Sequence, residues 1–112
     1  FVPKIPSYRI TDLAEAISPS AKKPICGIRP GEKIHEEMIT IAESAYTVEM
    51  EKIYAILPSD GELMKKYLSL DSKPIQVRKN FSYNSHDNDK FLTVQEIRNL
   101  IIENIDKEFT PL

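Results

Sequence analysis

The sequence has 112 residues, of which 41% are hydrophobic and 29% charged, and its formal net charge is −2. This length suits one domain and is too short for two, so we predict a single α+β domain over residues 1–112. The balanced charge excludes a strongly basic surface for nucleic acid or an anionic membrane, and no apolar run approaches the ~18 residues of a membrane-spanning helix.

The first part of the chain predicts two strands and two short helices. Residues 1–5 alternate apolar and polar side chains, but nearby prolines restrict them to an edge strand or an extended arm. Capping residues predict a helix over about 11–18. The apolar run 24–28 predicts a short buried strand, and the helical spacing of three apolar residues predicts a helix over 34–39.

The second part predicts two strands, then helices joined by loops. Alternation over 46–50 indicates a half-buried strand, and the continuous apolar run 53–57 indicates a buried one. Residues 59–62 match a capping box, followed by an apolar helical stripe of Leu63, Met64, Tyr67 and Leu68. A short extended piece is expected at 75–77. A second capping box, Thr93 with Glu96, predicts a helix over about 94–105.

A charged turn follows the predicted strand 24–28 and is the main candidate site. Pro30-Gly31 predicts a tight turn, because Pro restricts φ and Gly permits a positive φ. The guanidinium of Arg29 lies beside this turn, where its planar fork suits the oxygens of a phosphate. The alternative is a solvated turn whose charges pair with one another. These charges are Arg29, Glu32, Lys33, His35 and Glu36.

Other kinds of site find little support in the residues. Three glycines do not form a phosphate-binding loop. His35 and His86 are far apart in the sequence and lack zinc-ligand spacing, so we predict no metal site. The lone Cys26 excludes an internal disulfide and a Cys-based metal cluster and suits the reducing cytoplasm. Its apolar run predicts a buried, inert thiol.

Four blocks of the sequence resemble one family of enzymes. These blocks are residues 1–7, 11–14, 27–36 (Gly-Ile-Arg-Pro-Gly-Glu-Lys-Ile-His-Glu) and 83–92. They occur in the same order in the inverting UDP-N-acetylglucosamine 4,6-dehydratases, which are extended short-chain dehydrogenase/reductases that begin bacterial nonulosonic-acid and related surface-sugar pathways. The last block departs from the usual Ser-Ser-His-Asn-Asn, because Asn84 and Asp87 replace the first Ser and the first Asn.

The resemblance covers only the C-terminal third of such an enzyme, and the apolar start without Met suggests a chain cut from something longer. The family binds NADP on an N-terminal Rossmann domain that also carries a Tyr-x-x-x-Lys pair, and no such pair occurs here. The family reaction passes a hydride from C4 to NADP⁺, eliminates water across C5–C6, and returns the hydride to C6 with inversion at C5. The resemblance therefore implies a substrate-binding lobe without its Rossmann domain, inactive alone and binding no cofactor.

The resemblance also implies roles for particular residues. Arg29 would bind the diphosphate of a UDP-sugar, and Lys33 would add a point charge. Glu32 and Glu36 would orient these cations, while His86 and Asn88 would close over the nucleotide. The expected partners are the UDP-sugar, the missing N-terminal domain and, in a homo-oligomer, further copies. An apolar surface at Phe1, Val2 and Ile5 is expected where that domain is missing. The alternative is a stand-alone binding or protein-interaction module with an anion-binding Arg-Pro-Gly turn.

Overall fold

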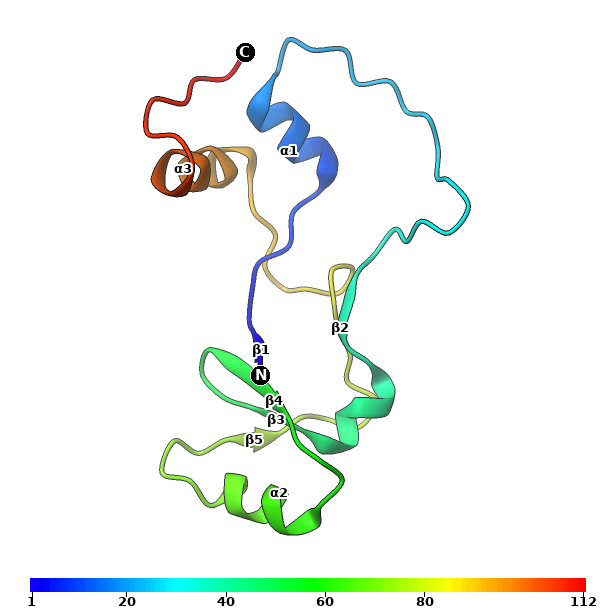
Figure 1. Ribbon diagram of the computed structural model, residues 1–112, viewed down its shortest axis with the longest axis vertical. Helices are drawn as coiled ribbons and strands as arrows, with labels where there is room; N and C mark the ends of the chain where they lie inside the picture. Colours follow the sequence, from blue (N-terminus) through cyan, green and yellow to red (C-terminus); the bar gives the residue numbers. More distant parts are fainter. The chain divides into compact units, whose positions relative to one another are not determined.

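The computed structural model describes all residues, 1–112, and contains both helices and strands, as predicted (Figure 1). The chain divides into two compact units. The first unit comprises Phe1–Ile5 and His35–Asp87, and the second comprises Pro6–Ile34 and Asn88–Leu112. That these two units together form a single domain over residues 1–112 stays a prediction. None of the helices is both long enough and apolar enough to cross a membrane.

The first unit contains a four-stranded antiparallel sheet with the order β1-β4-β3-β5. β3 (Thr47–Glu49) and β4 (Ile53–Ile56) form the central hairpin, which confirms two of the predicted strands. β1 (Val2–Pro3) pairs with β4 at one edge, as its prolines require, and β5 (Ile75–Gln76) pairs with β3 at the other.

Helix α2 (Gly61–Leu68) packs on the cluster of Val48, Ala55 and Leu57. The cap predicted from residues 59–62 is wrong by one residue, because the Asp60 side chain accepts a hydrogen bond from the Glu62 N–H at 2.9 Å. Leu63, Met64 and Tyr67 pack against this cluster as predicted, whereas Leu68 is 40% exposed.

A separate two-stranded ribbon pairs β2 (Glu37–Ile39) with β6 (Tyr83–Asn84). The helix predicted over 34–39 is therefore wrong. Glu37 and Met38 are exposed and Ile39 is fully buried, and the pairing with β6 shifts register between Glu37 and Ile39. Ile39 enters a cluster with Tyr54, Val77 and Tyr83. A 3₁₀ helix, η1 (Ile41–Tyr46), follows and is capped by Thr40 and Glu43.

Two hydrogen bonds from one side chain hold Ile5 in the first unit. The Tyr83 hydroxyl accepts from the Ile5 N–H at 2.8 Å and donates to the Ile5 carbonyl at 2.7 Å. The expected apolar surface is present at Phe1 and Ile5, which are 82% and 48% exposed. It does not include Val2, which packs against the Ile39 cluster.

The second unit is built on two helices, α1 (Ile10–Ile17) and α3 (Val94–Asn104), both close to their predicted bounds. The capping box of Thr93 and Glu96 is formed, with the Thr93 N–H donating to the carboxylate at 2.8 Å. Arg98 on α3 donates through Nε to the Ala16 carbonyl at 3.1 Å, so it satisfies a carbonyl at the end of α1.

The buried strand predicted over 24–28 is wrong. Ile25 is 94% exposed, and Cys26 is exposed as well, so its thiol is not buried. A short apolar run becomes a strand only when another strand pairs with it, and the second unit contains no named strand. Its one β-bridge is an isolated parallel pairing of Ser7 with Phe91.

Candidate functional site

The predicted turn forms at Pro30-Gly31, with Gly31 at φ 85°. This positive φ is the conformation that glycine adopts without the steric cost of a side chain. The turn is closed by the Glu32 N–H, which donates to the Arg29 carbonyl at 3.1 Å. The local sequence therefore determines the shape of the turn, since the positive φ of Gly31 and the closing hydrogen bond both lie within residues 29–32.

Glu32 contacts Arg29 twice with one carboxylate. Its Oε2 accepts from the Arg29 backbone N–H at 2.8 Å, and its Oε1 lies 3.2 Å from Nε of the guanidinium. Arg29 and Glu32 therefore pair, as the alternative predicts for charges of the turn. That Glu32 orients Arg29 toward a ligand stays a prediction.

The outer edge of the Arg29 guanidinium stays open to an anion. Glu32 engages Nε only, and the Arg29 side chain is 82% exposed. The terminal Nη1 and Nη2 atoms can therefore donate two parallel hydrogen bonds to an oxyanion. An exposed ion pair such as Arg29–Glu32 contributes only about 0–1 kcal/mol, so it does not compete strongly with such a ligand. Lys33 is exposed nearby in the sequence and forms no ion pair.

Two other predicted residues, Glu36 and His86, lie in the first unit. The contacts of Glu36 are made by its backbone, because its N–H donates to Ser85 Oγ at 3.0 Å and its carbonyl accepts from the Ser85 N–H at 2.8 Å. His86 lies against His35, with ring centroids 4.4 Å apart, and its Nε2 is 3.8 Å from Asp87 Oδ1.

Asn88 belongs to the second unit and has a structural contact. Its Nδ2 donates to the hydroxyl of Ser7 at 3.0 Å, and its Oδ1 accepts from the Lys90 N–H at 3.2 Å. Ser7 is buried, so its hydroxyl has little access to water, and Asn88 supplies the hydrogen-bond partner that water would otherwise provide.

Asn84 shapes the loop that carries His86, a role that the sequence reasoning missed. Its Oδ1 accepts from the backbone N–H groups of His86 and Asp87 at 2.8 and 2.9 Å. An Asn that bonds the backbone two and three residues further on is a common signal for such a turn, and Asn84 was noted only as a departure from the family pattern.

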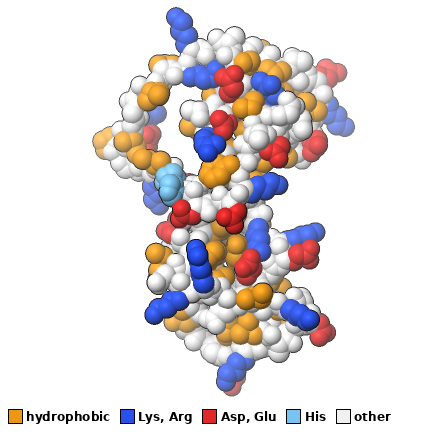
Figure 2. Space-filling view, turned by 180° about the vertical axis from the view of Figure 1, so that it is seen from behind, with side chains coloured by type: hydrophobic (Ala, Val, Ile, Leu, Met, Phe, Trp, Pro, Cys, Tyr) orange, Lys and Arg blue, Asp and Glu red, His pale blue; other side chains and the backbone are white.

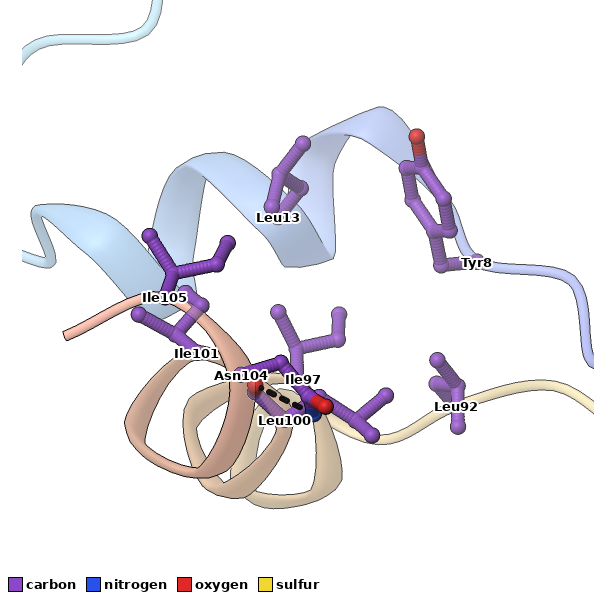
Figure 3. A pocket seen from close by; sticks show the side chains of 8 residues that line it. All are labelled: Tyr8, Leu13, Leu92, Ile97, Leu100, Ile101, Asn104 and Ile105. Carbon is purple, nitrogen blue, oxygen red and sulfur yellow. Dashed lines mark hydrogen bonds between the residues drawn. The ribbon is translucent and has the colours of Figure 1, made fainter. Parts of the chain in front are cut away.

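An apolar groove in the second unit does not suit a nucleotide. It has a volume of about 360 Å³ and is lined mainly by Ile97, Leu100, Ile101 and Ile105, with Leu13 of α1 facing them (Figure 3). The amide of its one polar residue from α3, Asn104, donates to the Leu100 carbonyl at 3.0 Å (Figure 3). A groove without a charged side chain offers a diphosphate no partner.

Comparison with known proteins identifies the class to which these features belong. Residues 1–58 match the family described as "Polysaccharide biosynthesis protein", and the chain belongs to this family. It is 42% identical over 105 residues to the protein named UDP-N-acetylglucosamine 4,6-dehydratase (inverting) of Campylobacter jejuni subsp. jejuni serotype O:23/36. The match covers 90% of this chain and 31% of that relative. The enzyme of the same name from serotype O:2 matches to the same extent.

The comparison confirms the resemblance seen in the sequence. The chain spans less than a third of the length of these curated relatives. No group of three or more His, Cys, Asp and Glu side chains that could hold a metal ion is present.

Proposed function

We propose that this chain provides the UDP-sugar-binding part of an inverting UDP-N-acetylglucosamine 4,6-dehydratase in bacterial surface-polysaccharide or nonulosonic-acid biosynthesis. The family match and the names of two relatives support the reaction class. The observation that carries the binding role is the Arg29 turn, in which Glu32 holds the guanidinium by Nε and leaves its outer edge exposed. The cytoplasmic location suggested by the lone cysteine is part of this proposal.

Arg29 would grip the diphosphate end-on. Two N–H donors meet two phosphate oxygens in this geometry, and Lys33 adds positive charge without fixed direction. Glu32 acts through Arg29, because an anion would be repelled by its carboxylate. Contacts of His86 and Asn88 with the nucleotide stay predictions, and so does the orienting role of Glu36.

The redox chemistry would lie outside these residues. NADP, when bound, accepts and returns the hydride, and the extended short-chain dehydrogenase/reductase fold implied by the resemblance binds it on a Rossmann domain. No Tyr-x-x-x-Lys pair and no Gly-rich phosphate loop occurs in the 112 residues. We therefore expect these residues alone to bind the UDP-sugar but not to convert it. Incubation with UDP-N-acetylglucosamine and NADP⁺ should yield no 4-keto sugar, and any turnover would overturn this part of the proposal.

The binding role is tested by titrating the protein with UDP-N-acetylglucosamine, followed by ³¹P NMR of the diphosphate. Arg29→Ala removes two charge-assisted hydrogen bonds, each about 1.5–3 kcal/mol, with part of the loss offset by water and Lys33. We expect affinity to fall at least about tenfold, which corresponds to about 1.4 kcal/mol. Arg29→Lys should restore only part of it, because an ammonium lacks the planar fork.

Arg9→Ala is the matched control. Arg9 forms an exposed pair with Asp12 at 3.5 Å, with the same three-residue spacing as Arg29 and Glu32 in the same unit. This variant changes the net charge equally without altering the turn, so its affinity should stay within about twofold of the wild type. Equal losses in both variants, or a wild-type protein that does not bind the nucleotide sugar, would refute the role of Arg29.

The protein-interaction module remains the second candidate, and the apolar groove between α1 and α3 favours it. Sequencing the gene upstream of Phe1 separates the two. A Gly-x-x-Gly-x-x-Gly motif after an apolar strand would support the enzyme, whereas a start codon directly before Phe1 would support the module.

A further inference from the structure

Folding brings together the two histidines of the chain, because His35 precedes β2 and His86 follows β6, at the same end of the antiparallel β2–β6 ribbon. The antiparallel register pairs Glu37 with Asn84, and the Ser85 N–H continues it by donating to the Glu36 carbonyl at 2.8 Å. The next pair in this register is His35 with His86. Figure 2 shows the histidines as one patch on the surface of the protein.

The charge around this pair suits a cation. Glu36, Glu37 and Asp87 lie in the same two segments, and these segments contain no Lys or Arg between residues 35 and 37 or between 83 and 87. Asp87 Oδ1 is 3.8 Å from His86 Nε2, close to one ring nitrogen of the pair. Asp87 is itself held by the Asn84 amide, which donates to its Oδ2 at 3.3 Å. Two imidazoles beside a fixed carboxylate are typical surroundings of a bound metal ion.

The spacing of the rings fits a particular coordination geometry. A metal–nitrogen bond of about 2.0–2.1 Å places a metal about 3.2 Å from the centre of an imidazole ring that ligates it. When both rings ligate one ion through a nitrogen, centroids 4.4 Å apart correspond to an angle of about 90° at the metal. This angle is that of neighbouring positions in an octahedral or square-planar site, and it is smaller than the tetrahedral angle of structural zinc sites.

We propose that His35 and His86 form a two-imidazole site for a divalent late transition-metal ion of octahedral or square-planar preference, such as Ni²⁺ or Cu²⁺. Water completes the coordination, since no third side chain converges on the pair. Asp87 Oδ1, 3.8 Å from His86 Nε2, is too far for a hydrogen bond and adds negative charge beside the site. The sequence argued against a metal because the histidines are far apart along the chain and lack zinc-ligand spacing, and the ribbon removes the first objection. This site does not use the Arg29 turn that carries the UDP-sugar proposal, although His86 is shared with the predicted nucleotide contacts, and its test contains no nucleotide.

A bound ion would join the start of β2 to the loop after β6. It would connect segments that are distant in sequence, and it would bind the folded ribbon better than the unfolded chain. Such binding stabilises the folded state in proportion to the logarithm of the ion concentration above the dissociation constant.

The test is calorimetric titration of the protein with NiCl₂ at neutral pH, without nucleotide. Both the protein and its variants carry Cys26→Ser, because the exposed thiol is a competing ligand. We expect one ion per chain, a higher midpoint of thermal unfolding with Ni²⁺, and no comparable effect of Mg²⁺, which prefers oxygen ligands.

Variants distinguish a shared ion from two independent histidines. His35→Ala and His86→Ala should each weaken Ni²⁺ binding at least about tenfold, and the double variant should lose it, because one imidazole is a poor ligand alone. Glu37→Gln is the control, since it removes a neighbouring charge but no imidazole, and its affinity should stay within about threefold. Circular dichroism verifies folding, which substitutions at exposed histidines should not disturb. Two ions per chain, single variants of unchanged affinity, or binding that survives in the double variant would overturn the site.

Discussion

Replacing Tyr83 with Phe tests how the start of the chain is held in the first unit. The Tyr83 ring is 9% exposed and packs with Ile39 and Tyr54, so loss of the hydroxyl leaves the core volume almost unchanged. The hydroxyl makes two hydrogen bonds with the backbone of Ile5, at 2.8 and 2.7 Å. At a net value of about 0.5–1.5 kcal/mol for each bond, Tyr83→Phe should lower the free energy of unfolding by about 1–3 kcal/mol.

Urea unfolding followed by far-ultraviolet circular dichroism measures this loss. Amide hydrogen exchange adds a local readout, because the Ile5 N–H should exchange faster in Tyr83→Phe while the amides of β3 and β4 change less. Tyr46→Phe is the matched control, since Tyr46 is 41% exposed and its hydroxyl has no hydrogen-bond partner in the protein. If Tyr83→Phe unfolds at the same urea concentration as Tyr46→Phe and leaves Ile5 exchange unchanged, the hydroxyl does not anchor the arm.

Two further predictions concern stability. Ile39→Ala should lower the free energy of unfolding, measured in urea, by about 2–5 kcal/mol, because Ile39 is fully buried. Ile75→Ala is the control and should lower it little, because Ile75 is 67% exposed. Equal losses would place Ile39 outside the core. Hydrogen bonds from Thr40 and Thr93 lower the pKa of Glu43 and Glu96 below the ordinary value of 4.5. A carboxyl whose pKa is lower in the folded state binds its proton more readily when unfolded, so its stabilisation is present above about pH 4.5 and is lost as the pH falls through the lowered value. Thr93→Ala removes the hydroxyl hydrogen bond but keeps the backbone N–H, which is the larger cause of the lowered Glu96 pKa. It should therefore flatten the acid limb of a plot of melting temperature against pH only in part, and an unchanged slope would contradict this.

Local signals in the sequence predicted the elements that form through local contacts. Helix α3 has its capping box and its apolar spacing within one segment, so nothing distant was needed to recognise it. The turn at Pro30-Gly31 was predicted for the same reason, as was the pairing of Arg29 with a nearby acid. These features depend on residues at most four positions apart.

The two element predictions that were wrong, the helix over 34–39 and the strand over 24–28, are ones that a distant partner decides. Residues 34–39 carry apolar side chains at spacings that a helix and a strand share, and pairing with β6 decides between them. The run 24–28 has the composition of a strand, but no strand pairs with it. The contact of His35 with His86 is set by the register of the ribbon, which the sequence of either segment alone does not contain.

The order of the two units along the chain has a consequence for biosynthesis. Residues 35–87 are inserted into the sequence of the second unit, whose two parts are 6–34 and 88–112. On the ribosome, α1 therefore emerges before residues 35–87 and has no helix partner within these residues until α3 has been translated. The nascent chain can complete the first unit while the apolar face of α1 waits uncovered, so the second unit should fold last and be more exposed to chaperones and proteases during synthesis.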